Sequence, residues 1–162
     1  MLDEPIVVCP PDKCSDETIQ RILDLICDGG AIPASRDTIE KRVLGAKSVV
    51  YLKRDGEIVG IAALKVPVQS YRDRIGEETG FPIPEQRFPY ELGYVVVDAS
   101  AQGQNLSPKL VDAVLDVAGG KGLFATTSSA AMHKILPRAG FVKGGEDYEK
   151  DDAEKLTLYV RE

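Results

Sequence analysis

The chain has 162 residues, of which 43% are hydrophobic and 28% are charged, and its formal net charge is −6. This length and composition are typical of one globular domain with a sizeable core, and no apolar run approaches the roughly 20 residues needed to span a bilayer. Because nucleic acids and anionic membranes attract basic surfaces, the negative charge argues against both as partners. We therefore expect a single domain over residues 1–162.

Cysteine and histidine are too sparse to predict a disulfide framework or a metal site. Cys9, Cys14 and Cys27 form no CxxC pair, and His133 is the only histidine. Cys9 and Cys14 could pair, but an odd cysteine count favours free thiols. The N-terminal sequence lacks a basic leader with a long apolar segment, so we expect a cytoplasmic protein.

The first 45 residues predict one strand and two helices. The apolar run Pro5 to Cys9 predicts the strand. Ser15 followed by two acidic residues is typical of a helix N-cap, and apolar residues then repeat at helical spacing until Gly29 and Gly30. Ser35 is expected to cap a second, shorter helix.

A β-hairpin is the next predicted unit. The β-rich runs Ser48–Lys53 and Ile58–Val66 flank Arg54–Glu57, which contains an Asp-Gly pair. Asp-Gly is favoured in two-residue hairpin turns because both turn positions need positive φ. We expect two antiparallel strands here.

The segment Pro67–Pro89 reads as a long loop with one or two helical turns around Ser70–Glu78. Loops of this length in compact domains are usually functional lids or surface insertions. The aromatics Tyr71, Phe81 and Phe88 favour a packed lid. Both alternatives stay open from the sequence.

The second half of the chain predicts alternating strands and helices. The expected elements are a strand at Tyr90–Asp98, a helix through Leu110, Val114 and Val117, a strand at Leu123–Thr127, a helix at Ala130–Ala139, and a last strand pair from Phe141 onward and at Lys155–Val160. Hairpins and strand-helix-strand crossovers in one chain predict a mixed sheet with helices packed on it. The fold class is therefore α/β with three layers.

The loop after the strand Tyr90–Asp98 carries the most informative motif. Val97-Asp98-Ala99 is followed by the hexapeptide Gln102–Ser107, which leads into a helix. Ser107-Pro108 is a helix-start signal with serine as the N-cap. This pattern resembles the acyl-CoA-dependent N-acetyltransferases of the GNAT superfamily, in which a strand leads into (Q/R)-x-x-G-x-(G/A). Gln102 fits the first position, whereas Asn105 stands where that motif prefers glycine and Ser107 where it prefers glycine or alanine. Asparagine tolerates the left-handed region better than most residues, and serine is nearly as small as alanine.

The resemblance implies a GNAT-like fold with a mixed, mostly antiparallel twisted sheet flanked by helices. It also implies acetyl-CoA as the cofactor. Its pyrophosphate would be held by the loop, and its pantetheine arm by the backbone of the preceding strand. The residues so implied are Val95, Val96, Val97, Gln102, Gly103, Gln104, Asn105, Leu106 and Ser107.

The segment SSAAMHKILPRAGF is similar to the penultimate helix of the same superfamily. Gly140-Phe141 fits its closing pair, which aligns Ser129 with the usual asparagine and Leu136 with the usual tyrosine. We expect Ser129 to cap the helix and contact the cofactor, and Pro137 to distort its last turn. The general acid common in the superfamily is absent, and nothing in the motif points to His133 as a catalyst.

Glu91 is the predicted general base, because its place at the start of the strand resembles that of the base in the histone-acetyltransferase branch. A glutamate paired with a lysine or arginine is the alternative interpretation. Gly93 lies on the same strand face and is expected to leave room beside the carboxylate for substrate or water. Tyr90, Tyr94, Tyr148 or water could supply the missing acid.

The predicted function is transfer of an acetyl group from acetyl-CoA to a primary amine on a small molecule or a protein, by direct attack in a ternary complex. The alternative is a GNAT-like module that binds coenzyme A or a protein partner without turnover. A nucleotide-binding protein is poorly supported, because GQNLSPK lacks the Gly-Lys-Ser/Thr of a P-loop. The oligomeric state stays open, with a homodimer as one option.

Overall fold

The computed structural model describes residues 6–28, 34–149 and 155–162, which divide into two compact units. The first unit comprises Met1–Lys65 and Leu92–Val117, and the second comprises Val66–Glu91 and Ala118–Glu162. Strand β4 (Tyr90–Val97) contributes its first two residues to the second unit and the others to the first. Each unit is described by itself.

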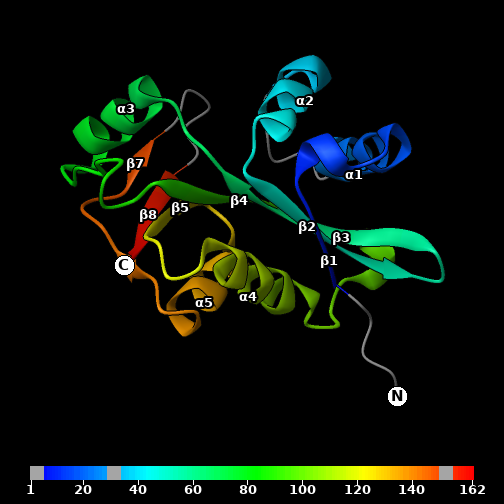
Figure 1. Cartoon of the computed structure of the whole chain (residues 1–162). Coiled ribbons are helices and arrows are strands. Elements are labelled where there is room, and N and C mark those ends of the chain that lie inside the picture. Colours follow the sequence, from blue (N-terminus) through cyan, green and yellow to red (C-terminus); the bar gives the residue numbers. More distant parts are fainter. Residues whose placement is uncertain (1–5, 29–33, 150–154) are drawn as a thin grey trace. The chain divides into compact units, whose positions relative to one another are not determined.

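The first unit is a sheet with strand order β1-β2-β3-β4, covered by helices (Figure 1). Strands β1 and β2 pair antiparallel, as do β2 and β3. Its elements are β1 (Ile6–Cys9), the 3-10 helix η1 (Pro11–Lys13), α1 (Asp16–Asp28), α2 (Arg36–Leu44), β2 (Ser48–Arg54), β3 (Glu57–Lys65), the 3-10 helix η2 (Ala99–Ala101) and α4 (Leu106–Ala118), whose last residue belongs to the second unit.

Both predicted N-caps of the first unit are confirmed. Ser15 Oγ accepts from the backbone N–H of Thr18 at 3.1 Å, and Ser35 Oγ accepts from that of Thr38 at 3.2 Å. Each cap satisfies one of the N–H groups that a helix start leaves without a partner. The predicted strand start at Pro5 and the helix end at Gly29-Gly30 lie outside the described residues.

The predicted hairpin is also confirmed. Asp55 and Gly56 connect β2 to β3 with φ values of 53° and 82°. Positive φ at both central residues is the requirement of the tight hairpin turn that Asp-Gly favours. The turn therefore sets the register of β2 against β3.

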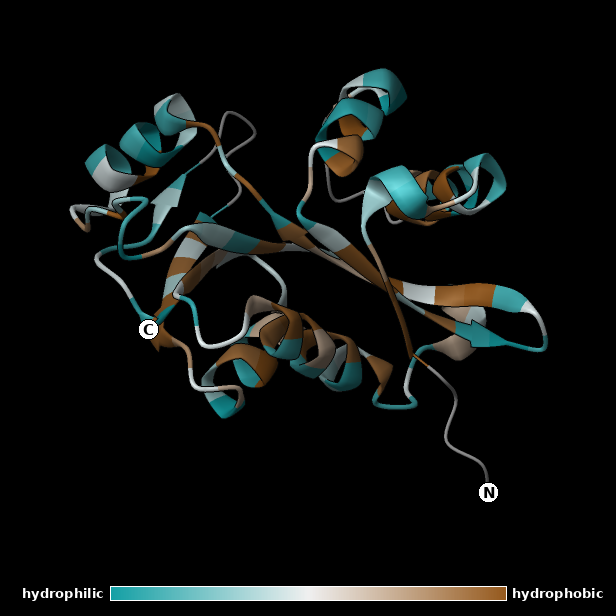
Figure 2. Cartoon of the chain, viewed as in Figure 1, coloured by the Kyte–Doolittle hydropathy of each residue, from teal (hydrophilic) through white to brown (hydrophobic). Residues whose placement is uncertain are grey.

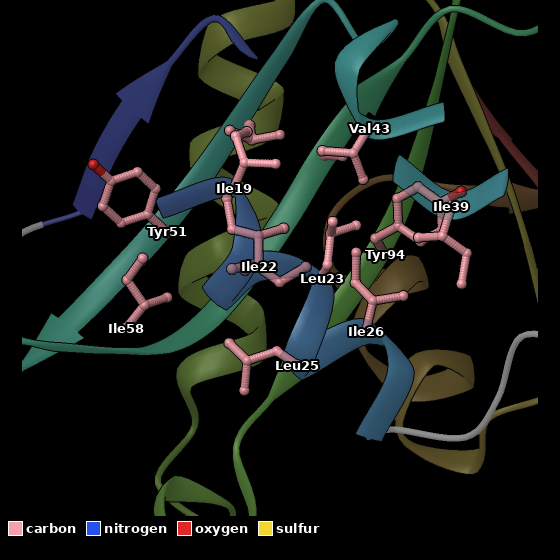
Figure 3. Packing of buried hydrophobic residues seen from close by; sticks show 13 residues of the cluster. Ile19, Ile22, Leu23, Leu25, Ile26, Ile39, Val43, Tyr51, Ile58 and Tyr94 are labelled. Atoms are coloured by element: carbon pink, nitrogen blue, oxygen red, sulfur yellow. The ribbon is translucent and has the colours of Figure 1, made fainter. Parts of the chain in front are cut away.

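The core of the first unit lies between its sheet and the helices α1 and α2 (Figure 3). Helix α4 covers the opposite sheet face, where a methyl group placed on Gly60 would lie 3.0 Å from Leu110 Cδ1. The core cluster joins Ile19, Ile22, Leu23, Leu25 and Ile26 of α1, Ile39 and Val43 of α2, and Val49, Tyr51, Ile58, Ile61, Ala63 and Tyr94 of the strands.

The second unit has strand order β4-β5-β8-β6, with β7 also paired to β8. Only the β4–β5 pair is parallel among the registers described for this unit. The predicted mixed, mostly antiparallel sheet flanked by helices is thus confirmed. The elements are α3 (Gln69–Thr79), β5 (Leu123–Thr127), α5 (Ala130–Arg138), β6 (Val142–Lys143), β7 (Tyr148–Glu149) and β8 (Lys155–Arg161).

Helix α3 corrects the prediction for the long loop, because it has 11 residues instead of one or two turns. The helix buries Arg72, Ile75 and Thr79, which lie on one helical face. Tyr71, Phe81 and Phe88 pack in the second core cluster with Phe124, Leu158 and Val160. The segment is therefore packed on the sheet, and the interpretation as a surface insertion is wrong.

Helix α5 begins at Ala130 as predicted and ends at Arg138, one residue before the predicted end. Ser129 Oγ accepts from the backbone N–H of Met132 at 3.4 Å, which confirms the cap. Pro137 lies inside the last turn, yet Ala139 N still donates to Ile135 O at 3.1 Å. The left-handed Gly140, with φ 94°, then closes the helix, because Gly140 N donates to Pro137 O and Phe141 N donates to Leu136 O.

Hydropathy varies strongly between elements (Figure 2). Strands β2 and β3 are mainly hydrophobic, whereas α3 is mainly hydrophilic.

None of the described helices has the length and apolar character needed to cross a membrane.

Candidate active site

The loop between β4 and α4 begins with a network around Asp98. Its carboxylate accepts from the backbone N–H of Ser100 at 3.2 Å and from the Ser100 hydroxyl, and Arg21 Nη2 lies 3.8 Å away. The bonds from Ser100, with a smaller contribution from Arg21, hold the pKa of Asp98 below its usual value. The loop backbone is thereby anchored at its start.

Two left-handed residues then shape the loop. Gly103 has φ 81° and Asn105 has φ 59°, so asparagine adopts here the conformation for which we expected it to be tolerated. A methyl group placed on Gly103 would meet no atom within 4 Å. Gln102 Nε2 donates to Val97 O at 3.2 Å and ties the loop back to the end of β4.

Helix α4 starts two residues earlier than predicted, at Leu106 instead of Pro108. The prediction of Ser107 as the N-cap is wrong, because Ser107 and Pro108 already lie in the first helical turn. Proline is tolerated there because N–H groups of the first turn have no acceptor in the helix. The helix start therefore offers the N–H groups of Asn105, Leu106 and Ser107 to a ligand.

The chemistry of this loop fits a phosphate-bearing ligand. The side chains of Gln102, Gln104 and Asn105 are neutral, and the nearby carboxylate of Asp98 is engaged by Ser100 and Arg21. The helix start adds partial positive charge, which favours an anion.

The strand before the loop departs from regular β geometry at Tyr94, which has φ 53°. Residues up to Tyr94 include the buried Leu92, whereas Val95, Val96 and Val97 are all half-buried. Pairing of β4 with β5 covers Tyr90–Glu91 in the described register. The backbone of Val95–Val97 could therefore bind an extended, amide-bearing ligand arm.

Gly93 has a different role from the one predicted. A methyl group placed on Gly93 would lie 2.5 Å from Lys65 Cδ, so the aliphatic stem of Lys65 occupies the space above the glycine. Lys65 Nζ lies 4.5 Å from the centroid of the Tyr94 ring, a cation–π contact. The expectation that Gly93 leaves room for substrate or water is wrong.

Glu91 is only 3% exposed, and its Oε2 accepts from the hydroxyl of Tyr71 at 2.7 Å. Burial, the charge of Glu91 and this hydrogen bond raise the pKa of Tyr71 well above its usual value. Tyr71 is therefore a neutral donor to the carboxylate over the physiological range. The chain thus holds a buried glutamate at the place predicted for the base.

The three tyrosines considered as acids lie in different surroundings. Tyr90 lines an open pocket of about 800 Å³ together with Arg87 and Lys121. The hydroxyl of Tyr94 is buried without a hydrogen-bond partner among the described residues. Burial, with a smaller contribution from the charge of Glu91, raises the pKa of Tyr148.

The other residues singled out in α5 make contacts that stabilise the fold. Leu136 is fully buried, so the position of the usual tyrosine lies in the core. His133 Nδ1 and Tyr159 Oη share a hydrogen bond of 2.8 Å, which supports a structural histidine. Ser129 caps the helix, and its contact with a cofactor stays a prediction.

The structure distributes the predicted residues between the two units. Val95–Val97 and Gln102–Ser107 lie in the first unit, and Glu91 and Ser129 lie in the second. Sequence reasoning missed Tyr71 and Arg72 as residues around Glu91. The spacing of Arg72, Ile75 and Thr79 would have indicated a buried helix face only if arginine had been counted as a core residue.

Comparison with known proteins identifies the family to which the chain belongs. A model described as the acetyltransferase (GNAT) family matches residues 24–141. No curated protein matches the chain.

Solved structures share the fold at low sequence identity. ElaA of Escherichia coli has a TM-score of 0.75 at 16% identity, with 99% of this chain and 100% of that chain covered. An acyl-CoA N-acyltransferase from Pseudomonas aeruginosa has a TM-score of 0.75 at 17% identity, with coverage of 99% and 100%. The ribosomal-protein-S18-alanine N-acetyltransferase of Escherichia coli has a TM-score of 0.66 at 14% identity, with coverage of 97% and 93%.

Proposed function

Because the chain belongs to the acetyltransferase (GNAT) family, we propose that it transfers an acyl group from acyl-CoA to a primary amine. We propose acetyl-CoA as the donor and one catalytic domain over residues 1–162. The acceptor is a small molecule or a protein amine, and one structural neighbour is named for an alanine of a ribosomal protein. We also propose a cytoplasmic location.

The observation that carries this proposal is the loop between β4 and α4. Left-handed Gly103 and Asn105 precede a helix start that offers N–H donors, and no carboxylate of the loop is free of partners. In the proposal this loop binds the pyrophosphate, and the backbone of Val95–Val97 binds the pantetheine arm. When bound, acyl-CoA supplies an acyl thioester.

Glu91 is the proposed general base. An amine with a pKa of about 10.4 is almost entirely protonated at neutral pH, so it must lose a proton before it can attack. Since Glu91 is 3% exposed, we propose that a water molecule carries the proton from the amine to the carboxylate. The amine then attacks directly in a ternary complex.

Departure of the thiol needs little help. A thiol pKa of about 8.5 makes the thiolate a good leaving group, so the buried Leu136 at the usual acid position is compatible with turnover. Tyr90, Tyr94, Tyr148 or water remain the proposed proton donors.

Acetyl-CoA binding and turnover test the proposal separately. A ligand that binds only the folded protein at a hundredfold excess over Kd stabilises it by about 2.7 kcal/mol, so acetyl-CoA should raise the melting temperature by several degrees. Free-thiol release should then be measured across a panel of amines. No thermal shift for folded protein at millimolar acetyl-CoA would contradict the proposal, and binding without turnover on any amine would favour the silent module.

Two variants test the acetyl-CoA-binding loop and the general base separately. Gly103→Val should weaken acetyl-CoA binding, because its backbone has φ 81° and an added side chain would enter the open space over the loop. Glu91→Gln should keep the affinity for acetyl-CoA and lower kcat by about 10²–10⁴-fold. This loss should shrink at high pH, where the amine is already neutral.

A further inference from the structure

Two consecutive residues of α3 converge on Glu91. Tyr71 donates its hydroxyl to the carboxylate at 2.7 Å. Arg72 is 3% exposed and donates to three backbone carbonyls, those of Ile83 at 3.0 Å, Phe88 at 2.6 Å and Pro89 at 3.0 Å. One helical turn therefore holds the side chain of Glu91 and also the backbone that leads to it.

The surroundings fix Tyr71 as well. Its ring centroid lies 6.3 Å from that of Phe124, which is the register partner of Glu91 on β5. Arg74 is a second neighbour, with 5.9 Å between its Cζ and the centroid of the Tyr71 ring. Because the ring is held by these neighbours, the direction of the hydroxyl toward Glu91 is set by packing.

We propose that Tyr71 is a positioning residue that orients the Glu91 carboxylate for proton transfer. This inference rests on the proposed function, in which Glu91 is the base. A phenol that donates to a carboxylate stabilises its ionised form, and a fixed oxygen is a better proton acceptor than one that rotates. Tyr71 itself touches no reacting atom in this role.

Several groups of the second unit contribute to the field at Glu91. The charge of Glu91 raises the pKa values of Tyr71 and Tyr148 and opposes the lowering of the Arg72 pKa by burial. Tyr71 and Arg72 come from α3, and Tyr148 comes from β7. Of these three, only Tyr71 is bonded to the carboxylate in a described hydrogen bond.

The test compares Tyr71→Phe with Tyr159→Phe. Tyr71→Phe removes only the hydroxyl and keeps the ring contact with Phe124. Tyr159→Phe removes a matched buried hydroxyl, bonded to His133, from the same unit. For each variant we would measure the melting temperature, the Kd for acetyl-CoA, and kcat across the pH range with the best acceptor amine.

We expect Tyr71→Phe to lower kcat by about 10- to 100-fold and to move the acid limb of the pH–rate profile to higher pH, with the Kd for acetyl-CoA unchanged. Tyr159→Phe should keep the wild-type kcat and profile. Equal losses of kcat in both variants, or a wild-type profile in Tyr71→Phe, would overturn the inference.

Glu91→Gln separates this inference from the proposed function. If Glu91→Gln is impaired and Tyr71→Phe is not, the base stands and the positioning role fails. If Glu91→Gln turns over like the wild type, both the role of Glu91 as the base and the positioning role of Tyr71 are wrong.

Should Tyr71→Phe not fold, 3-fluorotyrosine incorporated at position 71 provides a more acidic donor of nearly the same shape. It should move the acid limb to lower pH, and an unmoved limb would overturn the inference.

Discussion

Replacement of Arg72 by methionine should destabilise the second unit by about 3 kcal/mol. Methionine keeps much of the aliphatic stem but removes the guanidinium that donates to Ile83 O, Phe88 O and Pro89 O. A buried acceptor left without a donor costs about 1–3 kcal/mol, and these three carbonyls lie in one segment. The variant no longer buries the positive charge of Arg72, and this gain offsets part of the cost of the three unpaired carbonyls. The expected loss of stability therefore stays near 3 kcal/mol.

The assay is urea unfolding, followed by far-UV circular dichroism and tyrosine fluorescence because the chain has no tryptophan. With a slope of about 2 kcal/mol per molar, the midpoint should fall by about 1.5 M. Glu77→Met, on the exposed face of the same helix, is the control and should change stability by less than about 0.5 kcal/mol. A loss below about 1 kcal/mol for Arg72→Met would refute the assignment of these three bonds as a main stabiliser of α3.

Three further predictions test separate features. Gly122→Ala should be strongly destabilising in thermal unfolding, because its added methyl would lie 2.1 Å from Arg87 O, a backbone atom that cannot yield cheaply. Asn105→Gly should keep or tighten acetyl-CoA binding measured by calorimetry, since glycine adopts φ 59° without strain, and a large loss would show that the asparagine side chain is needed. Asp98→Asn should lower stability near neutral pH, because the bonds from Ser100 lower the pKa of Asp98 in the folded protein. That difference should begin to shrink as the pH falls through the usual aspartate value of 3.8 and should vanish only below the lowered pKa of Asp98 in the folded protein, and a pH-independent difference would contradict this.

Local signals explain why most elements could be predicted from the sequence. The caps at Ser15, Ser35 and Ser129 and the turn at Asp55-Gly56 depend on neighbours within four residues. Short sequence patterns predict such local interactions, so no knowledge of the tertiary structure is needed. The conformation of Asn105 was predictable for the same reason.

The misses arise from interactions between distant residues. Arg72 looks like a surface residue until the three carbonyls that accept its hydrogen bonds are known, and these lie 11 to 17 residues away. The pairing of Tyr71 with Glu91 likewise joins residues 20 positions apart. Sequence patterns of hydropathy cannot show such polar partners, because polarity alone predicts exposure.

The contact between Lys65 and Gly93 has a consequence for how this sequence can diverge. The atoms that a side chain at position 93 would meet are Cδ, Cε and Nζ of Lys65, the far end of a flexible side chain. A lineage could therefore gain alanine at 93 if Lys65 turned toward solvent. Such a change would give up the cation–π contact between Lys65 and Tyr94, so a small side chain at 93 should be found with a Tyr94 ring that no cation covers.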